Sequence, residues 1–130
     1  MKIEIRSLKE LNNNTIVQFM TQYGEGTGIW QGLPPKVNEV YDVELEITDV
    51  LSWGDNIAAC SASHYAIQIT GKSYCYTGKL EAIHNEEDIC VVTVRIDNSI
   101  LLLETIGTPS EVGCFVTFTI HNILLYDTDI

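Results

Sequence analysis

The sequence has few basic residues, with seven Lys and Arg against eighteen Asp and Glu, so its formal net charge at pH 7 is −11. Direct binding to DNA or RNA normally requires basic patches that contact phosphates. A strongly acidic surface repels phosphate backbones and anionic lipids, and it attracts cationic partners. We therefore expect neither a nucleic-acid nor a membrane partner. The charge fits either simple solubility or the binding of a basic partner.

Long apolar runs are also lacking, because no stretch approaches the ~20 residues that a membrane-spanning helix needs. Residues 1–6 alternate apolar and charged side chains, which is not the pattern of a signal peptide. The expected location is the cytosol, where cysteines stay reduced. The four cysteines include no C-x-x-C pair, so neither a zinc ribbon nor a redox pair is indicated. We expect no metal and no cofactor.

The length and the composition indicate one globular domain covering residues 1–130. A chain of 130 residues lies within the usual range of single domains. Hydrophobic residues make up 45% of the chain and charged residues 19%, which is typical of a folded protein with its own core.

Two-residue alternation dominates the sequence and predicts half-buried strands. The clearest example is residues 41–47. Their apolar members are expected to share the inner face of a strand: Tyr41, Val43, Leu45 and Ile47. Their acidic members are expected to share the face in water: Asp42, Glu44 and Glu46. Successive side chains of a strand point to opposite faces, so this strand would expose an acidic row.

Further strands are expected over residues 2–8, 65–69, 73–77, 90–96 and 99–103, and over one long strand at 114–126. Gly71-Lys72 and Asp97-Asn98 are predicted turns, and Gly78 predicts a bulge or a bend. The fold class is therefore all-β, an antiparallel sandwich or a curled partial barrel with at most one short helix. The one helical candidate is residues 55–64, for which a loop is an equal alternative. The glycine-dense residues 24–28 are predicted to form a flexible hairpin loop.

Three acidic clusters hold eight of the eighteen Asp and Glu residues: Asp42/Glu44/Glu46, Glu86/Glu87/Asp88 and Asp127/Asp129. Together with the small size, the β-rich pattern and the lack of catalytic motifs, they resemble the immunity proteins of bacterial toxin–immunity systems, including contact-dependent growth inhibition. The resemblance concerns the general character of the whole chain and rests on no diagnostic motif. Immunity proteins span many folds, so it assigns no residue by position.

The resemblance implies a protein that binds and occludes a basic partner, such as a toxin nuclease domain, and that is not an enzyme. Carboxylates would pair with Arg and Lys of the partner. The first candidates for this pairing are Asp42, Glu44 and Glu46, and the next are Glu86, Glu87 and Asp88. Aromatic anchors would supply much of the contact energy. Candidates for these anchors are Tyr23, Trp30 and Trp53.

Two other functions stay open at this stage. One is a small β-barrel that binds a sugar or a metabolite in a pocket lined by Tyr74, Tyr76 and Trp53. The other, less favoured, is an enzyme that uses Cys60 as a nucleophile with His64 as its base. Such a pair needs a third orienting group and a defined geometry, and no known signature surrounds these two residues.

Overall fold

The computed structural model describes residues 1–71 and 73–128, and within them it contains twelve strands and no helix. The all-β prediction is confirmed. The strands are β1 Lys2–Leu11, β2 Asn14–Thr21, β3 Gly24–Gln31, β4 Val40–Ile47, β5 Leu51–Ser52, β6 Ile57–Cys60, β7 Ala66–Thr70, β8 Ser73–Asn85, β9 Cys90–Ile96, β10 Ser99–Ile106, β11 Phe115–Ile120 and β12 Ile123–Asp127. The helix considered for residues 55–64 is wrong, because β6 occupies part of this segment.

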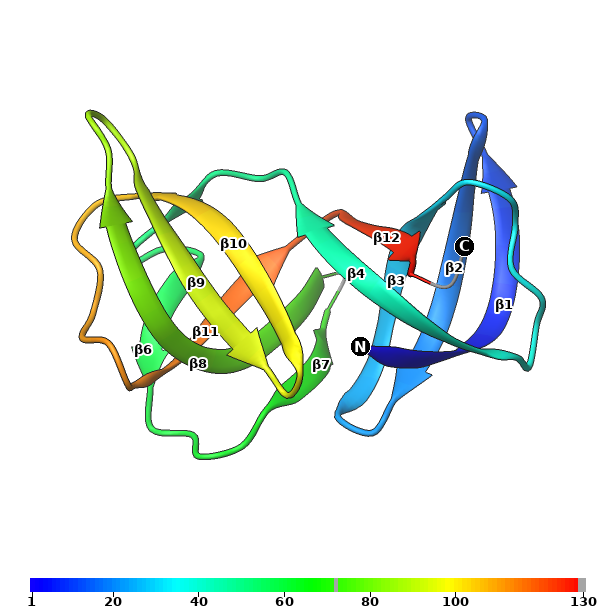
Figure 1. The fold of residues 1–130 in the computed structure, drawn as a ribbon, viewed down its shortest axis with the longest axis horizontal. Helices are drawn as coiled ribbons and strands as arrows, with labels where there is room; N and C mark the ends of the chain where they lie inside the picture. The colour runs from blue at the N-terminus through cyan, green and yellow to red at the C-terminus, as the bar shows by residue number, and fades with distance from the viewer. Residues whose placement is uncertain (72, 129–130) are drawn as a thin grey trace.

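Five strands close into a barrel in the order β1-β2-β3-β12-β4 (Figure 1). All neighbours in it are antiparallel except β3 and β12, which are parallel. This is the strand order of the five-stranded Greek-key barrels to which the OB-fold belongs. Closure leaves the barrel without a free edge, and side chains fill its narrow interior.

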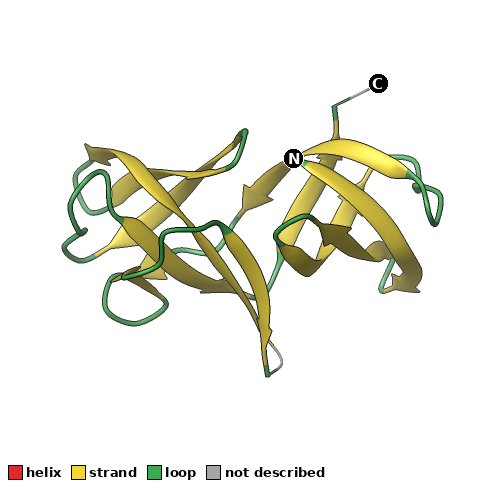
Figure 2. Ribbon diagram, turned by 90° about the horizontal axis from the view of Figure 1, so that it is seen from below, coloured by secondary structure: helices red, strands yellow, loops and turns green. Residues whose placement is uncertain are grey.

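Residues 48–122 lie between β4 and β12 and form a second unit, here called the inserted lobe. Its sheet has the order β5-β10-β9-β8-β11-β6, with β7 added to β8. Figure 2 shows the barrel and the inserted lobe side by side. The predicted hairpin of residues 90–96 and 99–103 is present, with Ile96 opposite Ser99 and Asp97 at a φ of 56°.

The two units share one pairing scheme. In each, a three-stranded antiparallel meander is flanked by a strand antiparallel to its first member and by a segment parallel to its third. The meander is β1-β2-β3 in the barrel and β8-β9-β10 in the inserted lobe. The first strand of each meander carries a register shift, between Ile5 and Ser7 and between Leu80 and Ala82.

The glycines at residues 24–28 do not form the predicted loop but belong to β3. A Cβ on Gly26 would lie 2.5 Å from the Phe19 ring, and one on Gly28 would lie 2.9 Å from Leu125. Both glycines therefore make room for large side chains inside the barrel. Close packing of this kind, rather than a flexible turn, accounts for the glycine density.

The barrel and the inserted lobe also touch directly. The backbone N–H of Ile67 in β7 donates to the carbonyl of Tyr23 at 3.0 Å. A Cβ on Gly24, whose φ is 137°, would lie 1.9 Å from the Ile67 carbonyl oxygen, so this crossing requires glycine. Buried side chains of both units form one hydrophobic cluster. The single domain expected for residues 1–130 stays a prediction, and the contact between the two units is compatible with it.

Two further expectations need correction. The long strand predicted for residues 114–126 is divided, because the chain leaves β11 in the inserted lobe at His121-Asn122 and enters β12 in the barrel. Gly78 lies in β8, but the register shift comes three residues later. Gly78 is required because there is no room for a side chain: a Cβ there would lie 2.6 Å from the Arg95 carbonyl oxygen. The predicted turn at Gly71-Lys72 includes Lys72, which lies outside the described residues.

Candidate functional site

The outer face of β4 carries the acidic row predicted from the sequence. Asp42, Glu44 and Glu46 are all exposed, while Val43 and Ile47 are buried on the other face. Asp42 pairs with the Met1 amino group at 3.0 Å. Within residues 1–71 and 73–128, neither Glu44 nor Glu46 forms an ion pair with Lys or Arg. The row therefore presents carboxylates that the chain's own cations leave largely uncompensated.

Neighbouring strands place particular side chains beside this row. Lys2 lies opposite Asp42 on β1, and Tyr126 lies opposite Glu44 on β12. The Tyr126 hydroxyl donates a hydrogen bond to Glu46, and this bond is the main cause of a raised pKa at Tyr126. The surface around the row thus combines carboxylates with an aromatic side chain that is 37% exposed. Of these side chains, the tyrosine is of a type enriched in protein contacts.

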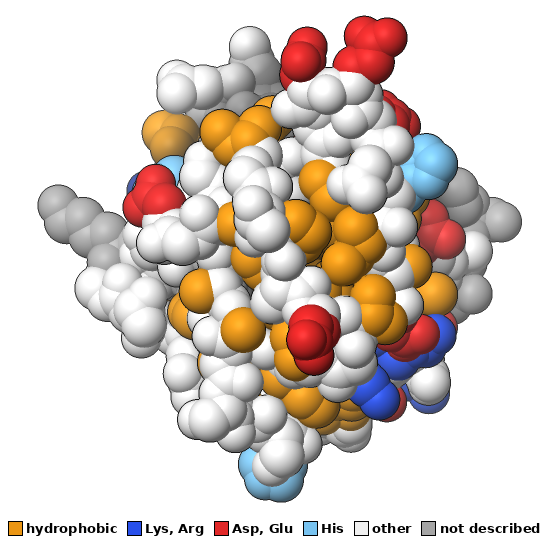
Figure 3. Space-filling view, turned by 90° about the vertical axis from the view of Figure 1, so that its left-hand side faces the viewer, with side chains coloured by type: hydrophobic (Ala, Val, Ile, Leu, Met, Phe, Trp, Pro, Cys, Tyr) orange, Lys and Arg blue, Asp and Glu red, His pale blue; other side chains and the backbone are white. Residues whose placement is uncertain are grey.

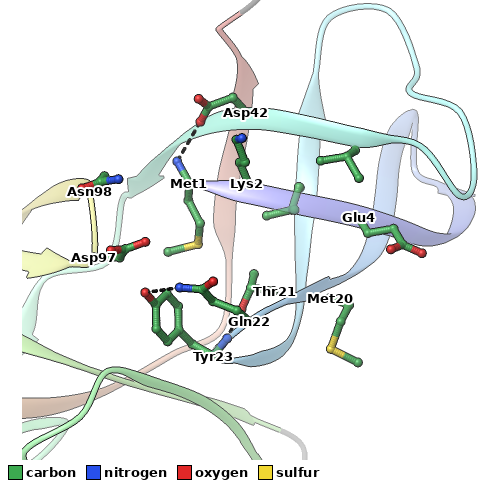
Figure 4. Close-up of a pocket in the computed structure, with 12 residues that line it drawn as sticks. Met1, Lys2, Glu4, Met20, Thr21, Gln22, Tyr23, Asp42, Asp97 and Asn98 are labelled. Carbon is green, nitrogen blue, oxygen red and sulfur yellow. Dashed lines mark hydrogen bonds and ion pairs between the residues drawn. The ribbon is translucent and has the colours of Figure 1, made fainter.

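A cavity of about 540 Å³, here called the junction pocket, opens at the Asp42 end of the row. Barrel residues supply most of its lining, and the β9–β10 turn of the inserted lobe supplies Asp97 and Asn98 (Figure 4). Tyr23 lies in this pocket, and burial together with the nearby Asp97 carboxylate raises the pKa of its hydroxyl. The structure therefore brings two predicted site residues, Asp42 and Tyr23, to one pocket.

The charges of the junction pocket favour a cationic group. Glu4, Asp42 and Asp97 line it, against Lys2 and the Met1 amino group. No group of three or more potential metal ligands occurs among the residues that the structure describes. The carboxylates therefore suit pairing with an external amine or guanidinium better than holding a metal ion.

The other two predicted aromatic anchors are elsewhere. Trp30 is 5% exposed, and its indole N–H donates to the Leu33 carbonyl at 2.7 Å. Its ring packs edge-on against Tyr41, with centroids 5.1 Å apart. Trp53 belongs to the inserted lobe, where its indole N–H donates to Thr105 Oγ1 at 2.9 Å. Neither side chain is brought to the acidic row.

The second acidic cluster is likewise separate from the row. Glu86, Glu87 and Asp88 connect β8 and β9 at the tip of a hairpin of the inserted lobe, whereas the row belongs to the barrel (Figure 1). At this tip His84 lies 3.9 Å from Glu86. Of the third cluster, Asp127 lies at the end of β12, and Asp129 lies outside the described residues. Asp127 pairs with Val43 of β4 and so lies beside the row, whereas Glu86, Glu87 and Asp88 are separate from it.

The residues considered for the two other functions do not assemble into sites. Tyr76 is fully buried and stacks on Phe118 at 5.7 Å, whereas Trp53 bonds to β10. The Tyr74 hydroxyl is hydrogen-bonded to Thr27 of the barrel. Neither the junction pocket nor a second cavity, at one end of the barrel, is lined by these three side chains. The exposed His64 contacts Ser63 at 3.4 Å, and no contact joins it to Cys60 among the described residues.

Sequence reasoning missed two residues beside the predicted site, Asp97 and Tyr126. Asp97 was interpreted only as a turn residue, and its approach to the barrel depends on how the two units pack. Tyr126 was assigned to a strand continuous with β11. Its alternation with the buried Leu125 was a usable signal that it faces outward.

Comparisons with protein-family models, with curated proteins and with solved structures found no match. The site is therefore interpreted from its own geometry. Within the described residues, no helix is long and apolar enough to cross a membrane.

Proposed function

We propose that this chain is a cytosolic immunity protein, which binds a basic partner through the outer face of β4 and occludes it. A toxin nuclease domain is the partner class favoured by the resemblance drawn from the sequence. In this proposal the protein acts by binding and not by catalysis, and it needs no cofactor.

One observation carries the proposal: Asp42, Glu44 and Glu46 are aligned and exposed on a strand held at both edges. β1 and β12 pair with β4 on either side, so the row is fixed on a closed barrel rather than on a loop. Carboxylates held in position lose little conformational freedom on binding. A net charge of −11 adds a field that speeds encounter with a cationic surface.

The junction pocket supports the same function. It lies at the Asp42 end of the row and adds the half-buried ring of Tyr23 and the carboxylate of Asp97. A partner side chain placed there would be surrounded by protein, and contacts in such pockets contribute more to affinity than those at an exposed rim.

The test is co-purification from the native host with two matched variants. The first variant is Asp42→Asn/Glu44→Gln/Glu46→Gln, and the second is Glu86→Gln/Glu87→Gln/Asp88→Asn. Both remove three negative charges, so they differ only in where the charge is lost. We expect the first variant to lose a basic protein that mass spectrometry identifies with the unaltered chain, and the second to retain it.

Salt provides an independent check. At roughly 0.5 M salt, attraction between surface charges is screened beyond a few ångströms, so capture of the partner should weaken markedly. If no basic protein is recovered while the partner is expressed, or if the two variants lose it equally, the proposal is wrong.

A further inference from the structure

A second cavity, of about 510 Å³, lies at one end of the barrel and is here called the barrel-end cavity. Three aromatic residues from three strands line it: Trp30 of β3, Tyr41 of β4 and Tyr126 of β12. The loop after β3 adds Leu33, which is 90% exposed. Aromatic residues from separate strands thus line one space, which is large enough to admit a side chain.

The walls of this cavity are fixed by contacts within the chain. The Trp30 indole N–H is bonded to the Leu33 carbonyl, and the Tyr41 hydroxyl accepts the backbone N–H of Lys36 at 2.8 Å. The same hydroxyl donates to Glu39 at 3.3 Å. Because these polar groups are already engaged, the rings offer a ligand mainly their π surfaces.

The charge around the barrel-end cavity is negative. Asp127 lines it directly, and Tyr126 is in contact with Glu46 of the acidic row. No Lys or Arg side chain lines the cavity within the described residues. An anion would be repelled here. A flat cation uses both features, since it stacks on aromatic faces and pairs with carboxylates.

We infer that the barrel-end cavity receives an arginine side chain of the basic partner, stacked against the partly exposed ring of Tyr126 and next to Trp30. The inference rests on the proposed function, because Tyr126 also lies beside the acidic row. It adds a preference for arginine over lysine, which charge alone does not explain. A lysine ammonium is more strongly hydrated and lacks a planar face, so arginine should be favoured.

The experiment titrates the full chain with capped tetra-arginine and tetra-lysine peptides and follows the indole NMR signals of Trp30 and Trp53, the only two tryptophans. We expect tetra-arginine to bind about tenfold more tightly than tetra-lysine, in line with a desolvated cation–π contact. The Trp30 signal should shift, and that of Trp53, in the inserted lobe, should stay in place.

Two variants at one position sharpen the test. Tyr126→Ala should reduce tetra-arginine binding to the level of tetra-lysine, whereas Tyr126→Phe, which keeps the ring, should stay within about twofold of the unaltered chain. Unchanged signals from the inserted lobe would show that each variant is folded.

Three results would overturn the inference. One is equal binding of both peptides with Trp30 unmoved, which places them on the acidic row alone and leaves the proposed function standing. The second is tighter binding of a capped phenylalanine peptide, which marks the cavity as an apolar site. The third is the absence of binding by either peptide.

Discussion

In the barrel, the strand that runs parallel to the third meander strand is continuous β12, whereas in the inserted lobe the corresponding segment is broken into β5 and β6. The break comes at residues 53–56, where Gly54 has a φ of 90°. The chain order differs too, because this segment follows the meander in the barrel and precedes it in the inserted lobe. The same pattern of strand pairing thus forms in both units, although the paired strands follow one another in a different order along the chain.

The exposed surfaces of the two units differ more than their strand pairings. The barrel presents the acidic row of β4, while the outer face of β10 in the inserted lobe exposes Ile100 and Leu102, at 54% and 65%. Figure 3 looks onto the end of the inserted lobe and shows hydrophobic side chains across the middle of that end, with one acidic side chain among them and others nearer the edge. The aligned acidic row therefore belongs to the barrel, although acidic residues occur on both units.

The largest expected effect concerns the shared core. Leu125→Ala in the barrel and Leu103→Ala in the inserted lobe each remove a fully buried side chain. Each should lower the free energy of unfolding by about 3 kcal/mol. If the two units form one cooperative core, urea should remove the native indole NMR signals of Trp30 and Trp53 together in both variants. Loss of one signal at a clearly lower urea concentration than the other would show that the two units unfold independently.

A glycine in each unit allows a direct comparison of packing. A Cβ on Gly78 would lie 2.6 Å from the Arg95 carbonyl oxygen, and one on Gly28 would meet side-chain atoms of Ile123 and Leu125 at 2.9 Å. Side chains adjust more readily than backbone, so Gly78→Ala should cost about 2–3 kcal/mol and Gly28→Ala about 1 kcal/mol. Chemical denaturation measures the free energy of unfolding of both variants. A larger loss for Gly28→Ala than for Gly78→Ala would contradict this account of the two sites.

A buried tyrosine in the inserted lobe has an unsatisfied hydroxyl. Among the described residues, Tyr76 Oη is the one buried side-chain nitrogen or oxygen atom without a hydrogen-bond partner. Replacing it by Phe removes that unpaired group and leaves the ring stacked on Phe118, so Tyr76→Phe should stabilise the fold by about 1 kcal/mol. A clear loss of stability in urea denaturation would show that the hydroxyl has a partner.

The same substitution has a pH signature. Burial raises the pKa of Tyr76 well above its usual value, so the folded protein keeps this proton at a pH where the unfolded chain releases it. The stability linked to this group is present below the unfolded pKa of about 10 and is lost as pH rises above it. Tyr76→Phe should therefore lose less stability between about pH 9.5 and 11 than the unaltered chain, and an equal loss would contradict the assignment.

The smallest effect is expected for the stability of the barrel when its acidic row is neutralised. Asp42→Asn/Glu44→Gln/Glu46→Gln changes only exposed side chains, so the free energy of unfolding should stay within about 0.5 kcal/mol. A loss of several kcal/mol in the same denaturation assay would mean that the row is needed for folding, and binding losses by this variant could not be assigned to lost contacts.

Much of the fold follows from local pattern. Alternation predicted β4 with its buried and exposed faces, and it predicted the β9–β10 hairpin at Asp97-Asn98. The β1–β2 hairpin was missed, although Asn12 and Asn13 adopt the positive φ values of 51° and 65° that suit a two-residue turn. Asparagine pairs between alternating segments are a signal that could have found it.

The rest depends on contacts that no local pattern encodes. The glycines of β3 were interpreted as a loop because their requirement comes from Phe19 and Leu125, which pack on them from other strands. For the same reason, the sequence identified the acidic row but not its neighbours. Tyr126 reaches the site through the antiparallel pairing of β12 with β4, and Asp97 reaches it through the packing of the inserted lobe on the barrel.

The most direct test of the central claim is the rate of association with the purified basic partner, measured by stopped flow as salt is raised. We predict that neutralising Asp42, Glu44 and Glu46 slows association at low salt by about tenfold or more, while neutralising Glu86, Glu87 and Asp88 slows it by less than about twofold. Equal slowing by the two variants would contradict the account, because the acidity would then act as an overall field and the face of β4 would have no special role.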